Sequence, residues 1–343
     1  MFKRKKPPLI LFLLIMSTLT FNIQPVKSEP KTWTVDDDGP ADFHTIQDAI
    51  NAADLGDTIF VKAGTYLEHV EINKTASLVG ENPANTILDG EGTIIPIVRI
   101  IAPNVTFCNF TVRNTASDWE TYGIYVRNTQ RVRIINNIVK QTYSGILLEN
   151  ASYCKVFNNT LLNNYAWGIY LRLEGSNNNM IGNSVVGNPT GVYIADSSCQ
   201  NNTFYHNNFV ENQNQISTFG IHTSWDNGAE GNYWSDYTGV DFYGGPYQNE
   251  TGSDGIGDTP YVINADNQDK YPLMEPWSPI MLVGDVNHDG VVNINDIVLI
   301  ASIYGCEEGE PYWNPEADLA PPYGKIDIYD LVTCVYHYGQ TRK

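Results

Sequence analysis

The chain has 343 residues, 42% of them hydrophobic and 17% charged, and its formal net charge is −19 at pH 7. These values are typical of a folded protein that is long enough for two domains. Nucleic-acid binding requires a basic surface, so the acid excess argues against it, and the same excess disfavours polyuronate substrates unless calcium bridges the charges.

The first 28 residues have the pattern of a secretory signal peptide. Basic residues at 3–6 precede an apolar run from Leu9 to Phe21, and Val26-Lys27-Ser28 offers a cleavage site. The run is short for a membrane span, and no second one follows. We predict a mature protein that starts near Glu29, outside the cell or at its surface, without a membrane span. Removal of five basic residues leaves 15 basic against 39 acidic residues, a formal charge of −24. An uncleaved anchor is the alternative.

Residues 42–53 have the spacing of a short amphipathic helix. Its apolar side chains recur three or four positions apart, at Phe43, Ile46, Ala49, Ile50 and Ala53. Strands are predicted after it, at Thr58–Val61, His69–Ile72 and Ser77–Val79. A helix in front of stacked strands suits a cap, because an open strand edge invites pairing with another chain.

The middle of the chain repeats with a period in the low twenties. Successive units begin at Gly123, Gly145, Gly168 and Gly191, at steps of 22, 23 and 23 residues. A second apolar strand follows an asparagine in each unit, in a column of Asn137, Asn159, Asn183 and Asn207, with Asn109 upstream and Asn232 downstream. Short alternating strands at this period predict a parallel β-helix, in which the asparagines form a structural ladder from coil to coil.

Alternation along the first strand of each unit predicts two columns of side chains that face solvent. One column contains Tyr125, Leu147, Tyr170 and Tyr193, and the other contains Arg127, Glu149, Arg172 and Ala195, with Arg99 expected upstream. Flat aromatic rings beside charged donors can bind a glycan, and Trp167 with Tyr122 and Tyr165 would extend that surface. The alternative is an ordinary strand surface with a weak charge ladder.

Both ends of this region resemble known β-helix families. Ala63-Gly64-Thr65-Tyr66 and the following Leu78-Val79-Gly80 resemble the N-terminal cap of pectin-lyase-like proteins. Motifs at 231–237, 254–261 and 270–276 resemble the tail of NosD-type periplasmic β-helix proteins. The resemblance implies an all-β fold, a right-handed parallel β-helix, which we place at residues 29–277 with its N-terminal capping helix.

The resemblance leaves the activity open. Polysaccharide lyases and hydrolases with this fold use an outer face of the same kind, with a basic residue or with paired carboxylates. The chain lacks the Asp-Asp and Gly-His-Gly set of the polygalacturonases and the aspartate pair with glutamines of the pectin methylesterases. An enzyme and a glycan-binding protein without activity therefore remain equal alternatives, and no catalytic residue is identified.

Two metals are considered for this region, copper and calcium. Copper sites need clustered His, Met or Cys, and copper is disfavoured because the histidines are far apart in sequence, at His44, His69, His206 and His222. Acidic residues of the tail are either calcium ligands or solvated loop residues, at Asp236, Asp241, Asp254 and Asp258.

A linker at 278–283 leads into a calcium-loop pattern. Side-chain oxygens occupy loop positions 1, 3, 5, 9 and 12, at Asp285, Asn287, Asp289, Asn293 and Asp296. Gly290 stands at the turning position of a loop that can wrap about six to eight oxygens around one ion. The pattern predicts a Ca²⁺ site followed by a helix.

The loop and its helix recur 34 residues later, with Asp330 and Gly339 in place of Asp296 and Gly305. The second loop starts at Asp318, is one residue longer, and lacks side-chain oxygens at its third and fifth positions. Its calcium site is expected to be weaker, or rebuilt from Asp318, Asp327, Asp330 and backbone carbonyls.

Two such units, each closed by Asp rather than Glu, resemble a type I dockerin over residues 284–343. The resemblance implies a module that folds on Ca²⁺ and docks to a cohesin-like partner. By analogy the docking residues are Ile294, Asn295, Ala301 and Ser302 in one unit and Ile328, Tyr329, Val335 and Tyr336 in the other. Cys306 and Cys334 also lie here and could form a disulfide.

These features together predict a secreted β-helix that binds or processes polysaccharide and is tethered to a cohesin-type partner. One alternative is a surface adhesin or structural solenoid without enzymatic activity. The other is a NosD-like copper-associated periplasmic protein.

Overall fold

The structure, a computed structural model, describes residues 29–220, 222–278, 282–286, 291–307, 310, 313–314 and 317–340. The predicted signal peptide at 1–28 lies outside these residues, and so do residues 279–281 of the predicted linker. Residues 1–30 and 31–343 are two separate units, and of the first only Glu29 and Pro30 are described. Within the described ranges, no helix combines the length and the apolar character needed to cross a membrane.

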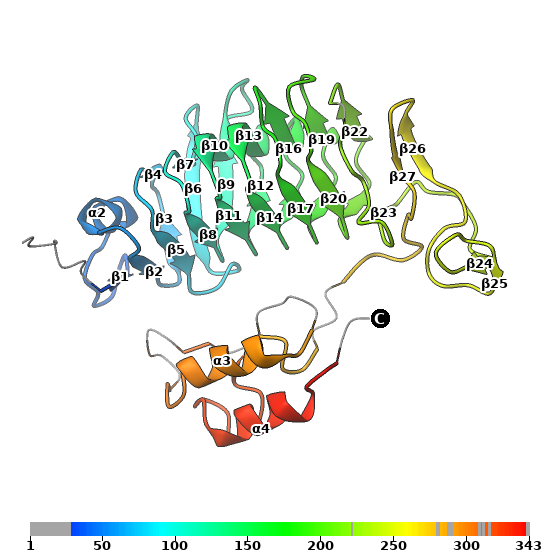
Figure 1. Ribbon diagram of the computed structural model, residues 1–343. Coiled ribbons are helices and arrows are strands. Elements are labelled where there is room, and N and C mark those ends of the chain that lie inside the picture. The colour runs from blue at the N-terminus through cyan, green and yellow to red at the C-terminus, as the bar shows by residue number, and fades with distance from the viewer. Residues whose placement is uncertain are drawn as a thin grey trace, which may run out of the picture. The chain divides into compact units, whose positions relative to one another are not determined.

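Stacked coils make up most of the described chain, and their strands form three parallel sheets (Figure 1). Sheet A has eight strands in the order β1-β2-β5-β8-β11-β14-β17-β20. They are Thr32–Val35 (β1), Thr58–Val61 (β2), Ser77–Gly80 (β5), Thr106–Cys108 (β8), Arg133–Ile135 (β11), Lys155–Phe157 (β14), Asn179–Ile181 (β17) and Thr203–Tyr205 (β20). The prediction of a right-handed parallel β-helix is confirmed, with about eight turns.

Sheets B and C complete each coil. Sheet B contains Gly64–Tyr66 (β3), Thr86–Thr93 (β6), Thr111–Thr115 (β9), Ile138–Lys140 (β12), Thr160–Leu162 (β15), Ser184–Val186 (β18), Asn208–Val210 (β21) and Tyr233–Trp234 (β23). Sheet C contains Val70–Ile72 (β4), Val98–Ile100 (β7), Tyr122–Gln130 (β10), Ser144–Ser152 (β13), Trp167–Arg172 (β16), Thr190–Ile194 (β19) and Asn214–Thr218 (β22). Neighbouring strands are about 4.8 Å apart, so equivalent residues of successive coils form columns.

The core of the solenoid follows from the alternation of side chains along each strand. In the short strands of sheet A the middle residue points inward, and these side chains are completely buried: Phe107, Ile134, Val156, Met180 and Phe204. They belong to one apolar cluster along the axis of the coils. The outward residues on either side of them are left to form the surface.

The predicted asparagine ladder is confirmed from Asn137 to Asn232. Asn159 illustrates the pattern, since its backbone N–H and its Nδ2 both donate to Oδ1 of Asn183 at 3.0 Å. Asn109 does not belong to this column, because its side-chain oxygen instead accepts from Nδ2 of Asn136 at 2.9 Å on the outside of the turn. Two ladders that the repeat did not predict run through Thr142, Asn164, Asn188 and Asn212, and through Cys154, Asn178 and Asn202.

Both ends of the solenoid are covered. The predicted N-terminal helix is present as α2 (Ile46–Ala52), with Thr45 as its N-cap, and it lies beside β1 and β2 (Figure 1). The other end carries two small hairpins, formed by β24 (Tyr243–Gly244) with β25 (Glu250–Thr251) and by β26 (Tyr261–Asn264) with β27 (Asn267–Asp269). Asp269 terminates the asparagine ladder, because it accepts from the N–H of Asn232 at 2.7 Å.

Two nine-residue helices follow towards the C-terminus, α3 (Ile294–Ser302) and α4 (Ile328–Tyr336). Each begins with a reciprocal capping box, between Asn293 and Asp296 in α3 and between Asp327 and Asp330 in α4. The identical spacing shows that the 34-residue repeat is a structural repeat.

The backbone around these helices is related by the same repeat. The N–H of Val292 donates to the carbonyl of Gln340 at 2.9 Å, and the N–H of Ile326 donates to the carbonyl of Cys306 at 2.9 Å. The two donors are 34 positions apart, and so are the two acceptors, but each donor bonds to the acceptor of the other unit. The two units therefore pack against each other with approximate two-fold symmetry.

All five cysteines are free thiols, so the disulfide considered for Cys306 and Cys334 is not formed. Cys334 is completely buried, and its Sγ donates to the carbonyl of Gly284 at 3.4 Å. Burial raises the pKa of Cys108 to about 12 and that of Cys154 to about 11, so these thiols stay protonated and act as small apolar residues.

Candidate functional site

The predicted glycan-binding residues come together on the outside of sheet C. We call this group the outer cluster: Tyr122, Tyr125, Leu147, Trp167, Tyr170, Tyr193 and Ala195. The register of β10, β13, β16 and β19 brings its members together, since Tyr125, Leu147, Tyr170 and Tyr193 are partners in successive strands. The column predicted from the repeat is therefore real.

The prediction that this whole column faces solvent is wrong. Tyr125 and Tyr170 are only 7% exposed, and Leu147 is completely buried. Rungs are about 4.8 Å apart, so outward side chains on neighbouring rungs cover one another. Only part of the cluster remains available to a ligand.

The accessible part of the outer cluster is centred on Trp167 and Tyr193, which are partly exposed. Their rings are 5.0 Å apart and within 22° of parallel, and Tyr170 stacks on Tyr193 at 5.2 Å. Tyr143 meets Trp167 edge to face at 5.7 Å. The rings pack their faces against one another, and the parts that stay exposed form a small aromatic surface against which a sugar ring can pack.

Beside the rings, Glu149 lies between two arginines. Its carboxylate accepts from Nε of Arg172 at 2.6 Å and is 2.9 Å from Nε of Arg127, a contact without hydrogen-bond alignment. The glutamate side chain is almost completely buried, whereas the Arg127 side chain is 43% exposed. The exposed guanidinium of Arg127 is thus the donor that a bound hydroxyl or carboxylate could reach.

Burial and neighbouring groups shift the pKa values of Tyr125 and Arg172. Burial raises the pKa of Tyr125, and the neighbouring Glu149 raises it further. Burial acts to lower the pKa of Arg172, but its hydrogen bond to Glu149 and its tyrosine neighbours outweigh burial, so the pKa is raised. Both groups therefore keep their protons and are hydrogen-bond donors.

Sequence reasoning misplaced or missed several neighbours. Arg99 lies in the tyrosine column, opposite Tyr125, and pairs with Glu71 at 2.6 Å. Glu120, 3.9 Å from Arg172, was not predicted, because it lies in the loop before β10 and outside the repeat. Tyr165 is 46% exposed at the corner before β16, as expected for an extension of the surface.

The first predicted calcium loop is described in part. Asn287 and Asp289 lie outside the described residues. Asp285 and Asp296 are both buried, at 5% and 0% exposure, and the N–H of Asn293 donates to Asp296 at 2.8 Å. Carboxylates removed from water at the start of a helix are suitable oxygen ligands for Ca²⁺.

The second predicted loop is closed differently. Asp330 is completely buried and accepts from the N–H groups of Leu319 (2.6 Å), Ala320 (2.9 Å) and Asp327 (2.7 Å). Asp318 accepts from the N–H of Gly324, while its buried Oδ1 has no hydrogen-bond partner within the described residues. Among the described residues, the second loop thus offers one side-chain oxygen without a partner, fewer Ca²⁺ ligands than the ligand pattern predicts for the first loop.

The helices that follow these loops expose apolar side chains at equivalent positions. Ile294 and Val298 of α3 are 57% and 58% exposed, and Ile328 and Val332 of α4 are 52% and 57% exposed. The residues predicted to face a partner are all exposed: Ile294, Asn295, Ala301, Ser302, Ile328, Tyr329, Val335 and Tyr336. The two faces differ most at Tyr329 and Tyr336, which replace Asn295 and Ser302.

The acidic residues of the β-helix tail serve as loop scaffolding. Asp241 accepts from Ser253, Asp254 and Gly255. Hydrogen bonds from backbone or side-chain donors likewise occupy Asp236, Asp254 and Asp258. Of the two readings of these residues, the arrangement favours loop structure over calcium ligation.

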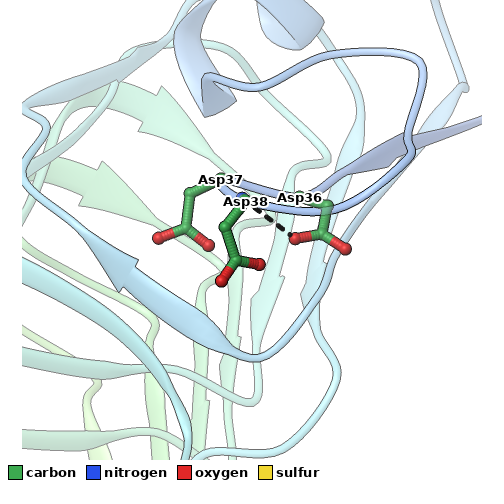
Figure 2. A group of neighbouring side chains, drawn as sticks. All are labelled: Asp36, Asp37 and Asp38. Atoms are coloured by element: carbon green, nitrogen blue, oxygen red, sulfur yellow. Dashed lines mark hydrogen bonds between the residues drawn. The ribbon is translucent and has the colours of Figure 1, made fainter.

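Another acidic group lies in the turn before α2, where Asp36, Asp37 and Asp38 bring one oxygen each within 4.8 Å (Figure 2). Oδ1 of Asp36 accepts from the N–H of Gly39 at 3.0 Å. Sequence reasoning missed this group. Exposed acidic turns of this kind are common without an ion.

The histidines that the structure describes do not converge on a common point. His44 contacts the carbonyl of Asp36, His69 contacts Thr93 and the carbonyl of Pro96, and His206 pairs with Glu230 at 2.6 Å. Asp36–Asp38 is the sole set of three His, Cys, Asp or Glu side chains with metal-binding spacing in the described part of the chain. That set has no soft ligand of the type copper prefers.

Solved structures with related folds are only distantly similar. A pectin methylesterase from carrot is 15% identical, covering 59% of this chain and 72% of that one, with a TM-score of 0.38. The catalytic domain of a GH87 alpha-1,3-glucanase is 17% identical, covering 62% and 42%, with a TM-score of 0.45. An alginate lyase from Paenibacillus sp. str. FPU-7 is 13% identical, covering 59% and 70%, with a TM-score of 0.36. Likenesses this weak carry no argument about function.

A family model gives a stronger relationship. No curated protein matches the chain. Residues 50–239, however, match the model of a family described as "Periplasmic copper-binding protein (NosD)". The match spans more than half of the chain and contains strands of all three sheets. The chain therefore belongs to the NosD family.

Proposed function

We propose that this protein is a secreted glycan-binding β-helix, held at its place of action by a Ca²⁺-dependent, dockerin-like module at residues 284–343 that docks to a cohesin-type partner. The observation that carries the proposal is the pair of exposed, symmetry-related apolar faces on α3 and α4. Exposed apolar positions that recur at equivalent places in both units are typical of a binding surface.

The calcium requirement is supported by the small size of the module's core. Among the module's described residues, few apolar side chains are completely or nearly buried: Val286, Val292, Ile300, Ala317, Ile326 and Cys334. A segment of this size usually needs a metal, disulfides or a partner for stability. Because its two cysteines are free, Ca²⁺ held by Asp285, Asn287, Asp289, Asn293 and Asp296 is the proposed source of that stability.

The glycan-binding role is supported by the outer cluster. Trp167 and Tyr193 offer stacked rings, and Arg127 offers an exposed donor next to them. Tyr125 and Tyr170 are buried and support these rings. Arg172 pairs with Glu149 and so holds that carboxylate next to Arg127. Binding is proposed rather than cleavage, because the carboxylate of Glu149 is almost completely buried between Arg127 and Arg172 and is therefore shielded from a ligand.

Copper binding, the property in the family's description, is not proposed for this chain. His44, His69 and His206 contact different partners, and of the five thiols Cys154, Cys199 and Cys334 are buried whereas Cys108 and Cys306 are partly buried. Soft ligands that converge are the minimum for a copper site, and the described residues do not fit this requirement.

A docking experiment tests the tether. The full-length chain in calcium should bind an immobilised type I cohesin module, and excess EGTA should abolish binding. Replacement of both Val298 and Val332 by Asp should weaken binding at least about tenfold, because a desolvated carboxylate opposes an apolar contact. Equal binding in EGTA, or no binding to any of a panel of cohesin modules, would contradict the proposal.

A further inference from the structure

The corner at which sheet C turns into sheet A carries basic residues without acidic partners. The described chain has six arginines, of which Arg99, Arg113, Arg127 and Arg172 form ion pairs. Arg131 and Arg133 form none, and neither does Lys155 on the next coil. Other described lysines also lack an ion pair, so what distinguishes this corner is that three unpaired cations lie together in a chain with 39 acidic residues.

Two of these cations are side by side. Arg133 and Lys155 are register partners in β11 and β14, about 4.8 Å apart along the solenoid. Like charges directly opposite each other destabilise a sheet. Burial lowers the pKa of Lys155, and the charge of Arg133 lowers it further, as expected for cations held together without an anion.

At this corner two bulky residues adopt a backbone conformation for which the neighbouring coils use asparagine. One turn position has positive φ in five successive coils, and three of them use asparagine there: Asn104, Asn177 and Asn201. The second and third of these coils instead place Arg131 and Tyr153 at this position, with φ of 57° and 56°. Bulky residues are uncommon in this conformation, and strain of this kind concentrates at ligand-binding positions.

Aromatic rings lie next to the unpaired cations. The guanidinium of Arg131 is 5.8 Å from the ring of Tyr153, and Nζ of Lys155 is 4.5 Å from the ring of Phe157. Tyr153 is 58% exposed, and removing the apolar surface of its ring from water would be favourable. Positive charge and an accessible ring are thus presented on one surface.

We propose that Arg131, Arg133, Tyr153, Lys155 and Phe157 form a second binding site, which takes a glycan whose units carry single anionic groups, carboxylate or sulfate. The anions supply the missing counter-charge and form charge-assisted hydrogen bonds with the guanidinium groups. Tyr153 stacks against a sugar ring. The site is separate from the outer cluster and does not depend on the docking module.

The charge of the whole molecule favours a glycan over nucleic acid. Duplex DNA carries one charge per about 1.7 Å of helix axis, and three cations on a chain of net charge −19 would be outweighed by repulsion. A glycan with one anion per sugar unit has spaced charges that match a small basic site.

Binding of the full-length chain to three polymers tests the proposal: polygalacturonate, dextran sulfate and uncharged dextran, compared by affinity electrophoresis at low ionic strength. The double variant Arg133→Gln/Lys155→Gln should weaken binding to the charged polymer at least about tenfold. Its Tm should stay unchanged or rise, because the like-charge contact is removed. Lys140→Gln/Lys270→Gln, which removes the same two positive charges elsewhere on the β-helix, is the control and should bind as the unsubstituted chain does.

A second double variant, Arg131→Asn/Tyr153→Asn, installs the residue that neighbouring coils use. It should keep or raise Tm while weakening the same binding, a combination that a purely structural role would not produce. Binding to polygalacturonate alone, dextran sulfate alone, or both identifies the anion, and each result supports the site.

Three results would overturn the proposal: no binding to either charged polymer, unchanged binding in both double variants, or equally tight binding to single-stranded DNA. Failure of the outer cluster is distinguishable, because Trp167→Ala should affect uncharged glycans and leave the charged polymers bound.

Discussion

The β-helix and the C-terminal module reach stability by different physical routes. In the β-helix each coil is covered by the next, so the apolar core extends from Val35 to Trp234 and the predicted asparagine ladder from Asn137 to Asp269. The module has a few buried apolar residues and concentrates buried carboxylates at the start of two short helices. One region is therefore stable through repetition, and the other is expected to depend on an ion.

The comparison can be sharpened first by breaking the ladder. Replacement of Asn183 by Ala removes an oxygen that accepts from the N–H and Nδ2 of Asn159, and an Nδ2 that donates to Val156 and to Asn207. Several buried polar groups would lose partners, at about 1–3 kcal/mol each. We expect a loss of about 3–5 kcal/mol from the β-helix, measured by urea unfolding followed by tryptophan fluorescence.

The control for this variant is the C-terminal module, whose calcium response should stay the same. Asn201→Ala, an exposed asparagine at a turn, should cost far less. A loss under about 1 kcal/mol for Asn183→Ala would mean that the ladder is not a main source of stability.

Asp269 gives the β-helix a pH dependence of its own. Burial raises its pKa to about 6, despite hydrogen bonds from Asn232, Trp234 and Tyr271 that act to lower it. The folded state thus holds the proton more tightly than the unfolded chain, whose value is near 3.8. The stabilisation by protonation is fully present below pH 3.8 and is lost as pH rises through about 6.

The measurement is the difference in unfolding free energy between the unsubstituted chain and Asp269→Asn at pH 4 and pH 7. Other carboxylates are common to both proteins and cancel. From pH 7 to pH 4 the difference should move by about 2 kcal/mol in favour of the unsubstituted chain. A constant difference would mean that Asp269 is not titrating in the folded state.

The two loops of the module allow a matched comparison within one domain. Asp296→Asn removes a charge from the loop with the complete ligand pattern, whereas Asp330→Asn changes a carboxylate already occupied by three N–H groups. Calcium affinity, measured by isothermal titration calorimetry, should fall about tenfold or more for Asp296→Asn and clearly less for Asp330→Asn. Equal losses would show that both loops bind calcium in the same way.

The smallest expected effect concerns the outer cluster. Trp167→Ala removes the ring that stacks on Tyr193, so affinity for an uncharged polysaccharide should fall by about 1–2 kcal/mol with Tm nearly unchanged. Tyr165→Ala, at the exposed corner nearby, should have less effect. Retention by affinity gels is the measurement, and unchanged retention for Trp167→Ala would remove this surface from the proposal.

Much of the β-helix could be predicted from sequence, because its repeat reports geometry directly. Glycine recurs as the second residue of β10, β13, β16 and β19, and asparagine recurs at the corner before sheet B, so the strand columns and the ladder through Asn183 follow from spacing. The other two ladders escaped prediction, since Thr142 and Cys154 replace asparagine at their ends and hide the pattern. Burial of Tyr125 and Tyr170 escaped as well, because it results from contacts between coils rather than from alternation within a strand.

In the module the spacing of 34 residues predicted matching helices, and the capping boxes at Asn293 and Asp327 agree with it. The unequal closure of the loops is less visible in sequence. It depends on the backbone N–H groups of Leu319 and Ala320, which donate to Asp330. Every residue type except proline has such a group, so the sequence does not reveal this contact.

Amide hydrogen exchange of the full-length chain, with calcium and with excess EGTA, tests the central contrast most directly. Protection of α3 and α4 should be lost in EGTA and restored by added calcium, while β10, β13 and β16 should keep their protection in both conditions. Equal protection of α3 and α4 with and without calcium would contradict the ion-dependent module, and the tether proposed from it.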